Sequence, residues 1–278
     1  SSMHFLSTKF NEETNQFDHL EDVLERVKYS STCWSKDNKG VFYACYPQQE
    51  GKTDGTETTA AHGQKIYYHR IGTKQSEDQL IHENPNEPEW MFGIQCSQDG
   101  KTMFKYVQKG CERTNKLYYT KLNEDKSIPN VEKIEWKTIR DEFKCQYSPI
   151  WTDGDVCYIQ TDEDAPKEKI IKIDLSQASF PADQPLGPDH IPEHPDNVLS
   201  SVSVCNMKHF IVNYMADCKD QVQVFDIETG KFSHDIEFSD MGSIGWSCRK
   251  YLSDIYFKLT GWVNPGAIYK YNIDSKEM

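Results

Sequence analysis

A repeated order of short apolar runs limits the folds open to this chain more than any other feature. Runs with alternating apolar residues end at Ile71, Leu122, Leu175, Ile227 and Ile273, and each is followed by a polar turn. Two further apolar runs precede each of them in the same order, and a fourth, weaker run closes several units. Four short antiparallel strands in a unit of about 50 residues are typical of one blade of a β-propeller.

The repeat predicts an all-β fold in which residues 1–278 form a single β-propeller domain. We expect five full blades plus a remnant, and so an incomplete ring, because residues 3–15 match only the third strand of a unit. A pair of β-sandwiches is the competing interpretation. It would not explain five units that share one internal order.

Three segments stand apart from the repeat. Residues 20–27 predict a helix of one or two turns, with Asp18 as its cap. Residues 179–197 contain five prolines and predict a surface loop, because proline cannot donate to a strand ladder. Residues 46–64 form a polar connection between two strand-like runs; a connection this long is usually functional or mobile, although composition alone equally allows a floppy hairpin tip.

Charge and cysteine content restrict the partners and the compartment. The net charge of −13 argues against nucleic acid and anionic membranes as partners, because phosphate groups select for excess Lys and Arg. No apolar run is long enough to span a membrane. The cysteines are nine in number, widely spaced and without a C-x-x-C pair, which indicates free thiols in a cytoplasmic protein. Most lie inside apolar runs, where we expect them to be buried and unreactive; these are Cys33, Cys45, Cys96, Cys157 and Cys205.

No catalytic signature emerges from the residues alone. The chain lacks a G-x-S-x-G nucleophile motif, a phosphate-binding G-x-x-x-x-G-K-[ST] loop and an H-E-x-x-H metal motif. We therefore expect no catalytic residues, no metal and no cofactor in this chain. The residues by themselves indicate a propeller that binds, gates or acts as a scaffold.

Several long ungapped stretches carry a family resemblance that covers essentially the whole chain. They are DVLERVKYSS, FYACYPQQEGKTDGTET, QKIYYHRIGTKQSEDQL, NEPEWM, DGKTMFKYVQKGC, DIETGK, MGSIGWS and DIYFKLTGWVNPGAIYKYNI. They closely resemble the propeller of the prolyl oligopeptidase (prolyl endopeptidase) family. The resemblance implies a seven-bladed propeller that covers an α/β-hydrolase domain with a Ser-Asp-His triad, in a serine peptidase that cleaves short peptides after proline.

The resemblance also implies partners and a division of labour. The partners are the protein's own α/β-hydrolase domain, absent from this chain, and short proline-containing peptides. Because the triad belongs to the hydrolase domain, we expect this chain alone to be inactive. Two functions are open: a substrate-gating domain of such a peptidase, or a stand-alone propeller that acts as a scaffold for protein partners.

Positions that face the substrate in the family map onto four residues here. Tyr29, Met91 and Cys111 are the residues that the resemblance assigns to the pocket wall, and Gln108 stands where the family has an arginine. Tyr29 replaces a usual phenylalanine and adds a hydroxyl that needs a partner or water. Without the resemblance, each would be interpreted as an ordinary residue at a strand end. The polar connection 46–64 corresponds to the family's mobile loop at the domain interface, with Thr58 near its contact side.

Overall fold

The computed structural model describes residues 8–19, 22–47, 62–128, 133–262 and 265–278. It divides into two compact units: residues 1–145 with 178–182, and residues 146–177 with 183–278. In the described residues, the regular elements are strands and one short 3₁₀ helix, η1 (Gln75–Glu77). No helix in this part of the chain is long and apolar enough to cross a membrane.

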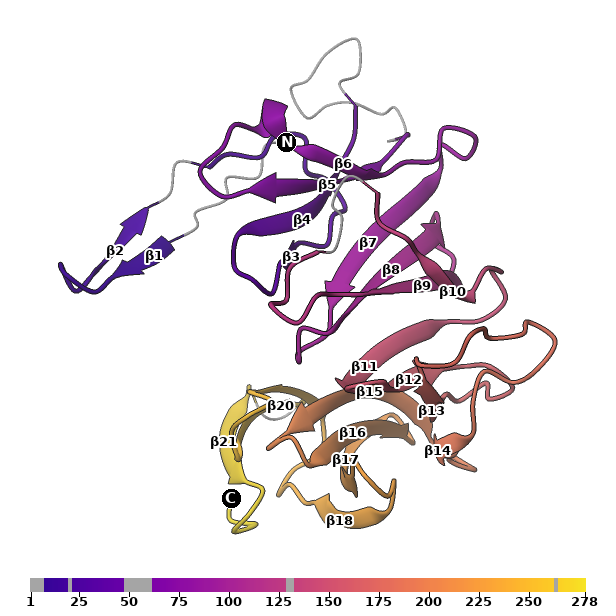
Figure 1. Ribbon diagram of the computed structural model, residues 1–278. Coiled ribbons are helices and arrows are strands. Elements are labelled where there is room, and N and C mark those ends of the chain that lie inside the picture. Colours follow the sequence, from indigo (N-terminus) through magenta and orange to yellow (C-terminus); the bar gives the residue numbers. More distant parts are fainter. Residues whose placement is uncertain (1–7, 20–21, 48–61, 129–132, 263–264) are drawn as a thin grey trace. The chain divides into compact units, whose positions relative to one another are not determined.

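The first unit contains a hairpin and two four-stranded antiparallel sheets (Figure 1). The hairpin pairs β1 (Thr8–Asn11) with β2 (Gln16–His19). The first sheet has the order β3 (Cys33–Trp34), β4 (Gly40–Cys45), β5 (Lys65–Arg70), β6 (Gln79–His82). The second has the order β7 (Trp90–Cys96), β8 (Thr102–Lys109), β9 (Asn115–Lys121), β10 (Lys137–Arg140).

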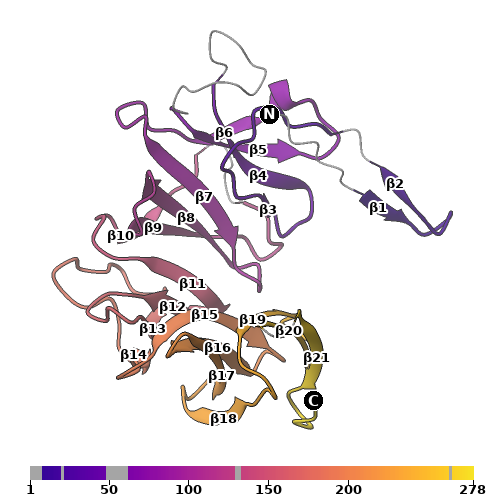
Figure 2. The same ribbon diagram turned by 180° about the vertical axis from the view of Figure 1, so that it is seen from behind.

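The second unit contains three more antiparallel sheets, each built from consecutive strands (Figure 2). The first is β11 (Tyr147–Asp153), β12 (Val156–Thr161), β13 (Lys169–Asp174), β14 (Asp189–Ile191). The next is β15 (Val198–Cys205), β16 (His209–Ala216), β17 (Lys219–Asp226), β18 (Phe232–Ile236). The last is β19 (Ser243–Cys248), β20 (Asp254–Thr260), β21 (Ala267–Asn272).

The predicted all-β repeat is confirmed, with two differences in detail. Four sheets have the four strands that the repeat predicts, but the fifth has three in the described residues. The N-terminal remnant supplies two strands, β1 and β2, where the sequence indicated one.

The first hairpin of each sheet in the first unit is closed by the same turn. Ser35 Oγ donates to Asp37 Oδ1 at 2.6 Å, and the N–H two residues after Asp37 donates to the same oxygen at 3.1 Å. Ser97 and Asp99 repeat the arrangement at 2.5 and 3.0 Å. An aspartate that accepts from the backbone two residues on is a common way to stabilise a tight turn. The repeat therefore extends to individual hydrogen bonds.

Apolar side chains fill the spaces between consecutive sheets within each unit. In the first unit, Phe42 and Ile66 of one sheet pack with Phe92, Met103 and Val107 of the next. Two clusters in the second unit do the same on either side of the β15–β18 sheet. Side chains alternate between the two faces of a strand, so a sheet with two apolar faces needs a neighbour on each side.

Side-chain oxygens tie two of these pairs of sheets in register. Gln64, immediately before β5, accepts the N–H of Phe92 in β7 through Oε1 at 2.6 Å. Asp220, in β17, accepts the N–H of Ile244 in β19 through Oδ2 at 2.6 Å. In both cases the acceptor lies at the start of the third strand of one sheet and the donor in the first strand of the next. Apolar packing has no preferred direction, so these hydrogen bonds fix how one sheet lies along the next.

The helix predicted at residues 20–27 is wrong for the part that the structure describes. Residues 22–27 have no helical turn. Leu24 and Val27 are buried against Tyr43 and Cys45 of β4. Asp22 points at β5, where its carboxylate accepts a hydrogen bond from His69. Contacts with the sheet thus override the local helical spacing.

The proline-rich segment 179–197 is not entirely a loop. Within it, β14 (Asp189–Ile191) pairs with β13, with Ile191 opposite Ile170. The strand lies between Pro188 and Pro192 at the edge of its sheet. Proline has no backbone N–H to donate, and an edge strand tolerates this because it has no further strand to pair with on its outer side. The Pro188 carbonyl still accepts from Lys172 N at 3.1 Å.

We expect the core between β15–β18 and β19–β21 to dominate the stability of the second unit. Phe257 is fully buried there, with its ring 5.1 Å from that of Phe238. Phe257→Ala should lower the free energy of unfolding by about 3–5 kcal/mol through lost burial and the cavity left behind. Phe232→Ala, at a side chain 52% exposed, is the control and should cost much less. Urea denaturation measures both, and equal losses would contradict this account.

Candidate functional site

Met91 and Gln108 are neighbours at one end of the β7–β8 hairpin. In β7, Phe92, Ile94 and Cys96 are buried in the core, so the alternate residue Met91 lies on the opposite face. It is half-buried and stands directly opposite Gln108, which is exposed. Side chains directly opposite each other on antiparallel strands share a face and are in contact range.

Cys111 lies at the same end of this hairpin. It follows β8 by two residues, in a turn in which Glu112 N donates to the Lys109 carbonyl oxygen at 3.2 Å. Gly110 has a φ of 55°, a conformation that favours glycine. The turn leaves the Cys111 thiol exposed.

Tyr29 is held near Met91 by a buried glutamine. The side chain of Tyr29 is 71% exposed, and its φ of 50° is unusual for a residue of this size. Gln64 Nε2 donates to the Tyr29 carbonyl oxygen at 3.2 Å, while Gln64 Oε1 accepts from Phe92 N. Gln64, only 1% exposed, thereby connects Tyr29 to the residue that follows Met91.

The four residues that the resemblance assigns to the substrate side are thus connected through one hairpin end. Met91 and Gln108 form a direct pair, Cys111 follows Gln108 in the chain, and Tyr29 is joined through Gln64. Thr58 lies outside the described residues. In the part of the chain that the structure describes, no group of His, Cys, Asp and Glu is arranged to hold a metal ion.

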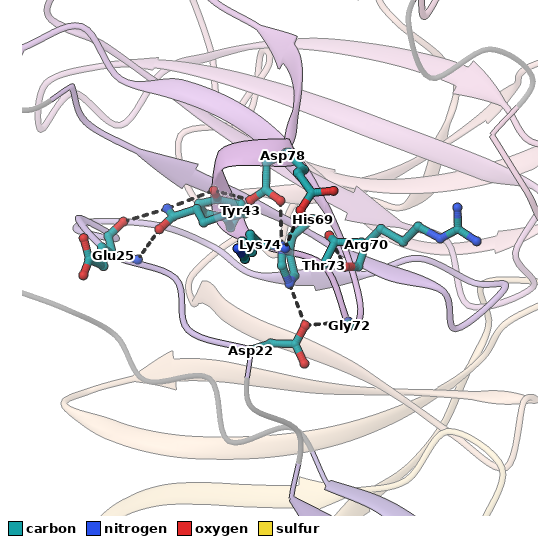
Figure 3. Close-up of polar contacts among 11 residues, drawn as sticks. Asp22, Glu25, Tyr43, His69, Arg70, Gly72, Thr73, Lys74 and Asp78 are labelled. Atoms are coloured by element: carbon teal, nitrogen blue, oxygen red, sulfur yellow. Dashed lines mark hydrogen bonds and ion pairs between the residues drawn. The ribbon is translucent and has the colours of Figure 1, made fainter.

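A second polar cluster, which sequence reasoning missed, is buried beside the first sheet (Figure 3). His69 lies between two carboxylates, with Nδ1 2.6 Å from Asp78 Oδ1 and Nε2 2.9 Å from Asp22 Oδ1. The Tyr43 hydroxyl donates to Asp78 Oδ2 at 2.7 Å, and Gly72 N donates to Asp22 Oδ1 at 2.6 Å. Burial raises the pKa of the Asp78 carboxyl, against the hydrogen bonds from Tyr43 and His69.

The buried His69 cluster has the residue types of a catalytic site but the surroundings of a structural one. The side chains of Asp22, His69 and Asp78 are each at most 4% exposed, so no substrate reaches them. The cluster joins β5, the segment after η1 and the chain that leads to β3. Asp22 lies 47 residues from His69, so no local motif signals the arrangement.

This chain matches one protein family and several proteins of that family. The family model of the prolyl oligopeptidase N-terminal β-propeller domain matches residues 8–278. Prolyl oligopeptidase A of Amanita bisporigera is 33% identical over 267 residues, which cover 95% of this chain and 34% of that protein. Prolyl endopeptidase of Dictyostelium discoideum is 30% identical over 271 residues, covering 92% of this chain and 34% of that protein.

A solved structure is also similar to this chain. Prolyl oligopeptidase B from Galerina marginata, bound to a 35mer hydrolysis and macrocyclization substrate, matches with a TM-score of 0.82 at 30% identity. The match covers 93% of this chain and 34% of that one. This chain therefore spans about a third of the length of the relatives it matches.

Gln64 should be a positioning residue for both Tyr29 and β7. Gln64→Leu leaves the Phe92 N–H and the Tyr29 carbonyl without their partner, which should cost about 1–3 kcal/mol of unfolding free energy. Amide hydrogen exchange at Phe92 should become faster. Gln108→Leu, at the exposed end of β8, is the matched control and should leave Phe92 protected. Unchanged exchange at Phe92 in Gln64→Leu would rule out the bridge.

His69 should be required for stability because it compensates two buried carboxylates. His69→Leu should lower the free energy of unfolding by about 3 kcal/mol or more, whereas exposed His62→Leu should change little. In the variant, the pKa of Asp78 rises further above its unfolded value. Such a carboxyl stabilises the fold most when protonated, so its contribution is lost as the pH rises through the folded pKa. The difference in unfolding free energy between wild type and His69→Leu should therefore become smaller as the pH falls from about 7 to about 4. Urea denaturation at each pH measures it.

Proposed function

The chain belongs to the prolyl oligopeptidase family as its N-terminal β-propeller domain, and on that premise we propose that it gates access to a serine endopeptidase that cleaves short peptides after proline. The observation that carries the proposal is the grouping of Tyr29, Met91, Gln108 and Cys111 around one end of the β7–β8 hairpin. This grouping supports a role for that end as the propeller's side of the substrate pocket.

The chemistry of these residues suits a peptide of variable sequence. The flexible thioether of Met91 adapts to side chains of different shape, and the exposed ring of Tyr29 offers apolar area with a polar tip. Gln108 is neutral and both donates and accepts. We therefore propose that Gln108 contacts the peptide through hydrogen bonds rather than through a charged group.

The catalytic groups would come from a separate part of the protein. The relatives are about three times as long as this chain, and we propose that an α/β-hydrolase domain, with the Ser-Asp-His triad, is its partner. The propeller would admit short, flexible peptides, exclude folded proteins by size, and keep water from the closed site. We place the protein in the cytoplasm, where its nine free thiols would stay reduced.

Substitution of Met91 in the full-length protein tests the substrate contact. Met91→Ala should raise KM for a short proline-containing peptide roughly 5–20-fold, with kcat nearly unchanged, because binding surface is lost in ground and transition states alike. Met207→Ala, at an exposed methionine between β15 and β16, is the matched control and should leave both constants unchanged. The 278-residue chain alone should not turn over the peptide. A KM that is insensitive to Met91→Ala would remove this residue from the pocket.

A further inference from the structure

Two thiols from neighbouring sheets of the first unit meet at the edge of the core between them. Cys33 lies in β3 and Cys96 is the last residue of β7. Cys96 N donates to Cys33 Sγ at 3.2 Å, so the two cysteines are in direct contact. Cys96 is buried, and Cys33 is only partly so, which leaves it within reach of a small reagent.

The sequence-based expectation that Cys33 is buried, with a raised pKa, is wrong. The hydrogen bond from the Cys96 thiol, together with the Cys96 N–H and the charge of Lys36, lowers the pKa of Cys33 to about 7 against the opposing effect of burial. The same pairing raises the pKa of Cys96, with burial adding to it. Cys33 Sγ also lies 3.5 Å from the Trp34 carbonyl oxygen, a contact that only its protonated form makes. Cys33 is therefore partly a thiolate at neutral pH, and Cys96 is its protonated partner.

We propose that Cys33 and Cys96 form a redox-sensitive pair, which a hydroperoxide converts into a disulfide that links β3 to β7. The geometry supplies both requirements, a partly accessible thiol and a second cysteine whose backbone N–H already contacts the sulfur of the first.

The reaction proceeds in two steps. The Cys33 thiolate attacks one oxygen of hydrogen peroxide, the O–O bond breaks, hydroxide leaves, and Cys33 becomes a sulfenic acid. The Cys96 thiol then gives its proton to this hydroxide, which forms the first water. The Cys96 sulfur next attacks Cys33 Sγ, the S–O bond breaks, and the second hydroxide leaves with a proton as water. In total the two thiols lose two electrons and two protons, and peroxide is reduced to two waters.

A second pair of cysteines, also on the first strands of two consecutive sheets, provides a control. Cys205 and Cys248 are the last residues of β15 and β19, the first strands of two consecutive sheets. Their thiols point at carbonyl oxygens, Cys205 Sγ at Leu252 O (3.2 Å) and Cys248 Sγ at Val204 O (3.4 Å). Burial raises the pKa of both. We expect this pair to remain reduced under conditions that oxidise Cys33.

The disulfide would connect residues 63 positions apart in the chain. It would therefore constrain the unfolded chain and raise the melting temperature by roughly 5–10 °C. The same two segments also carry Tyr29 and Met91, so oxidation would stiffen the proposed pocket wall. That last consequence rests on the proposed function, whereas the disulfide itself does not.

The test is peptide mapping of the 278-residue chain after treatment with hydrogen peroxide and blocking with N-ethylmaleimide. The expected product is a Cys33–Cys96 linked peptide, about 2 Da lighter than its two reduced halves and released by dithiothreitol. Cys205 and Cys248 should carry the maleimide. Alkylation of Cys33 by iodoacetamide should be roughly tenfold faster than that of Cys248 at pH 7, with a midpoint near pH 7.

Two variants separate the roles of the thiols. Cys96→Ser should leave Cys33 as a sulfenic acid that dimedone traps, and Cys33→Ser should leave Cys96 unoxidised. Cys248→Ser should form the link as the wild type does. The proposal is overturned if wild-type Cys33 stays reduced or is oxidised without a bond to Cys96, or if Cys205 and Cys248 react as readily. These readouts need no peptidase activity, so a failure of the proposed function leaves them unaffected.

Discussion

The β3–β6 sheet depends on its neighbours because both faces of its strand β4 are apolar and buried. In β4, Phe42 and Tyr43 are consecutive and point to opposite faces, yet their exposed fractions are 1% and 2%. Phe42 packs towards β7 and β8, and Tyr43 towards Leu24 and Val27. Such a sheet cannot be stable alone in water, since either face would expose a large apolar area. The packing between sheets therefore both stabilises the fold and places the strand ends.

Apolar packing by itself does not fix how one sheet lies along the next, because it has no preferred direction. The bonds from Phe92 N to Gln64 and from Ile244 N to Asp220 supply that direction in the two units. Gln64 makes a second contact, because its amide nitrogen also donates a hydrogen bond to the Tyr29 carbonyl oxygen. The position of Tyr29 relative to Met91 is thus a consequence of the bond that aligns the two sheets.

The sequence predicts what depends on local pattern. Runs rich in apolar, aromatic and β-branched residues located β4, β5 and β12 closely, because such runs favour strands and are visible in neighbouring residues. Leu24 and Val27 have helical spacing, but β4 supplies the surface that buries them and Asp22 is bound by His69, 47 residues away. Similarly, β14 depends on its partner β13, which a proline-rich stretch does not reveal.

The candidate site likewise has residues that the sequence indicates and residues that only tertiary contacts reveal. The resemblance located Met91, Gln108 and Cys111 through stretches of matching sequence, but no residue pattern indicated that Gln64 would join Tyr29 to β7. The lowered pKa of Cys33 was hidden for the same reason, since it arises from a cysteine 63 positions later.

The two cysteine pairs show how a repeated scaffold can carry different chemistry. Each pair spans the first strands of two consecutive sheets. At Cys33, hydrogen bonds from its partner outweigh burial and favour the thiolate. At Cys205 and Cys248, burial outweighs the favourable contacts and the thiol keeps its proton. The pKa of Cys33 is therefore set mainly by the side chain of Cys96, with a smaller effect from the Cys96 N–H, against the opposing effect of burial.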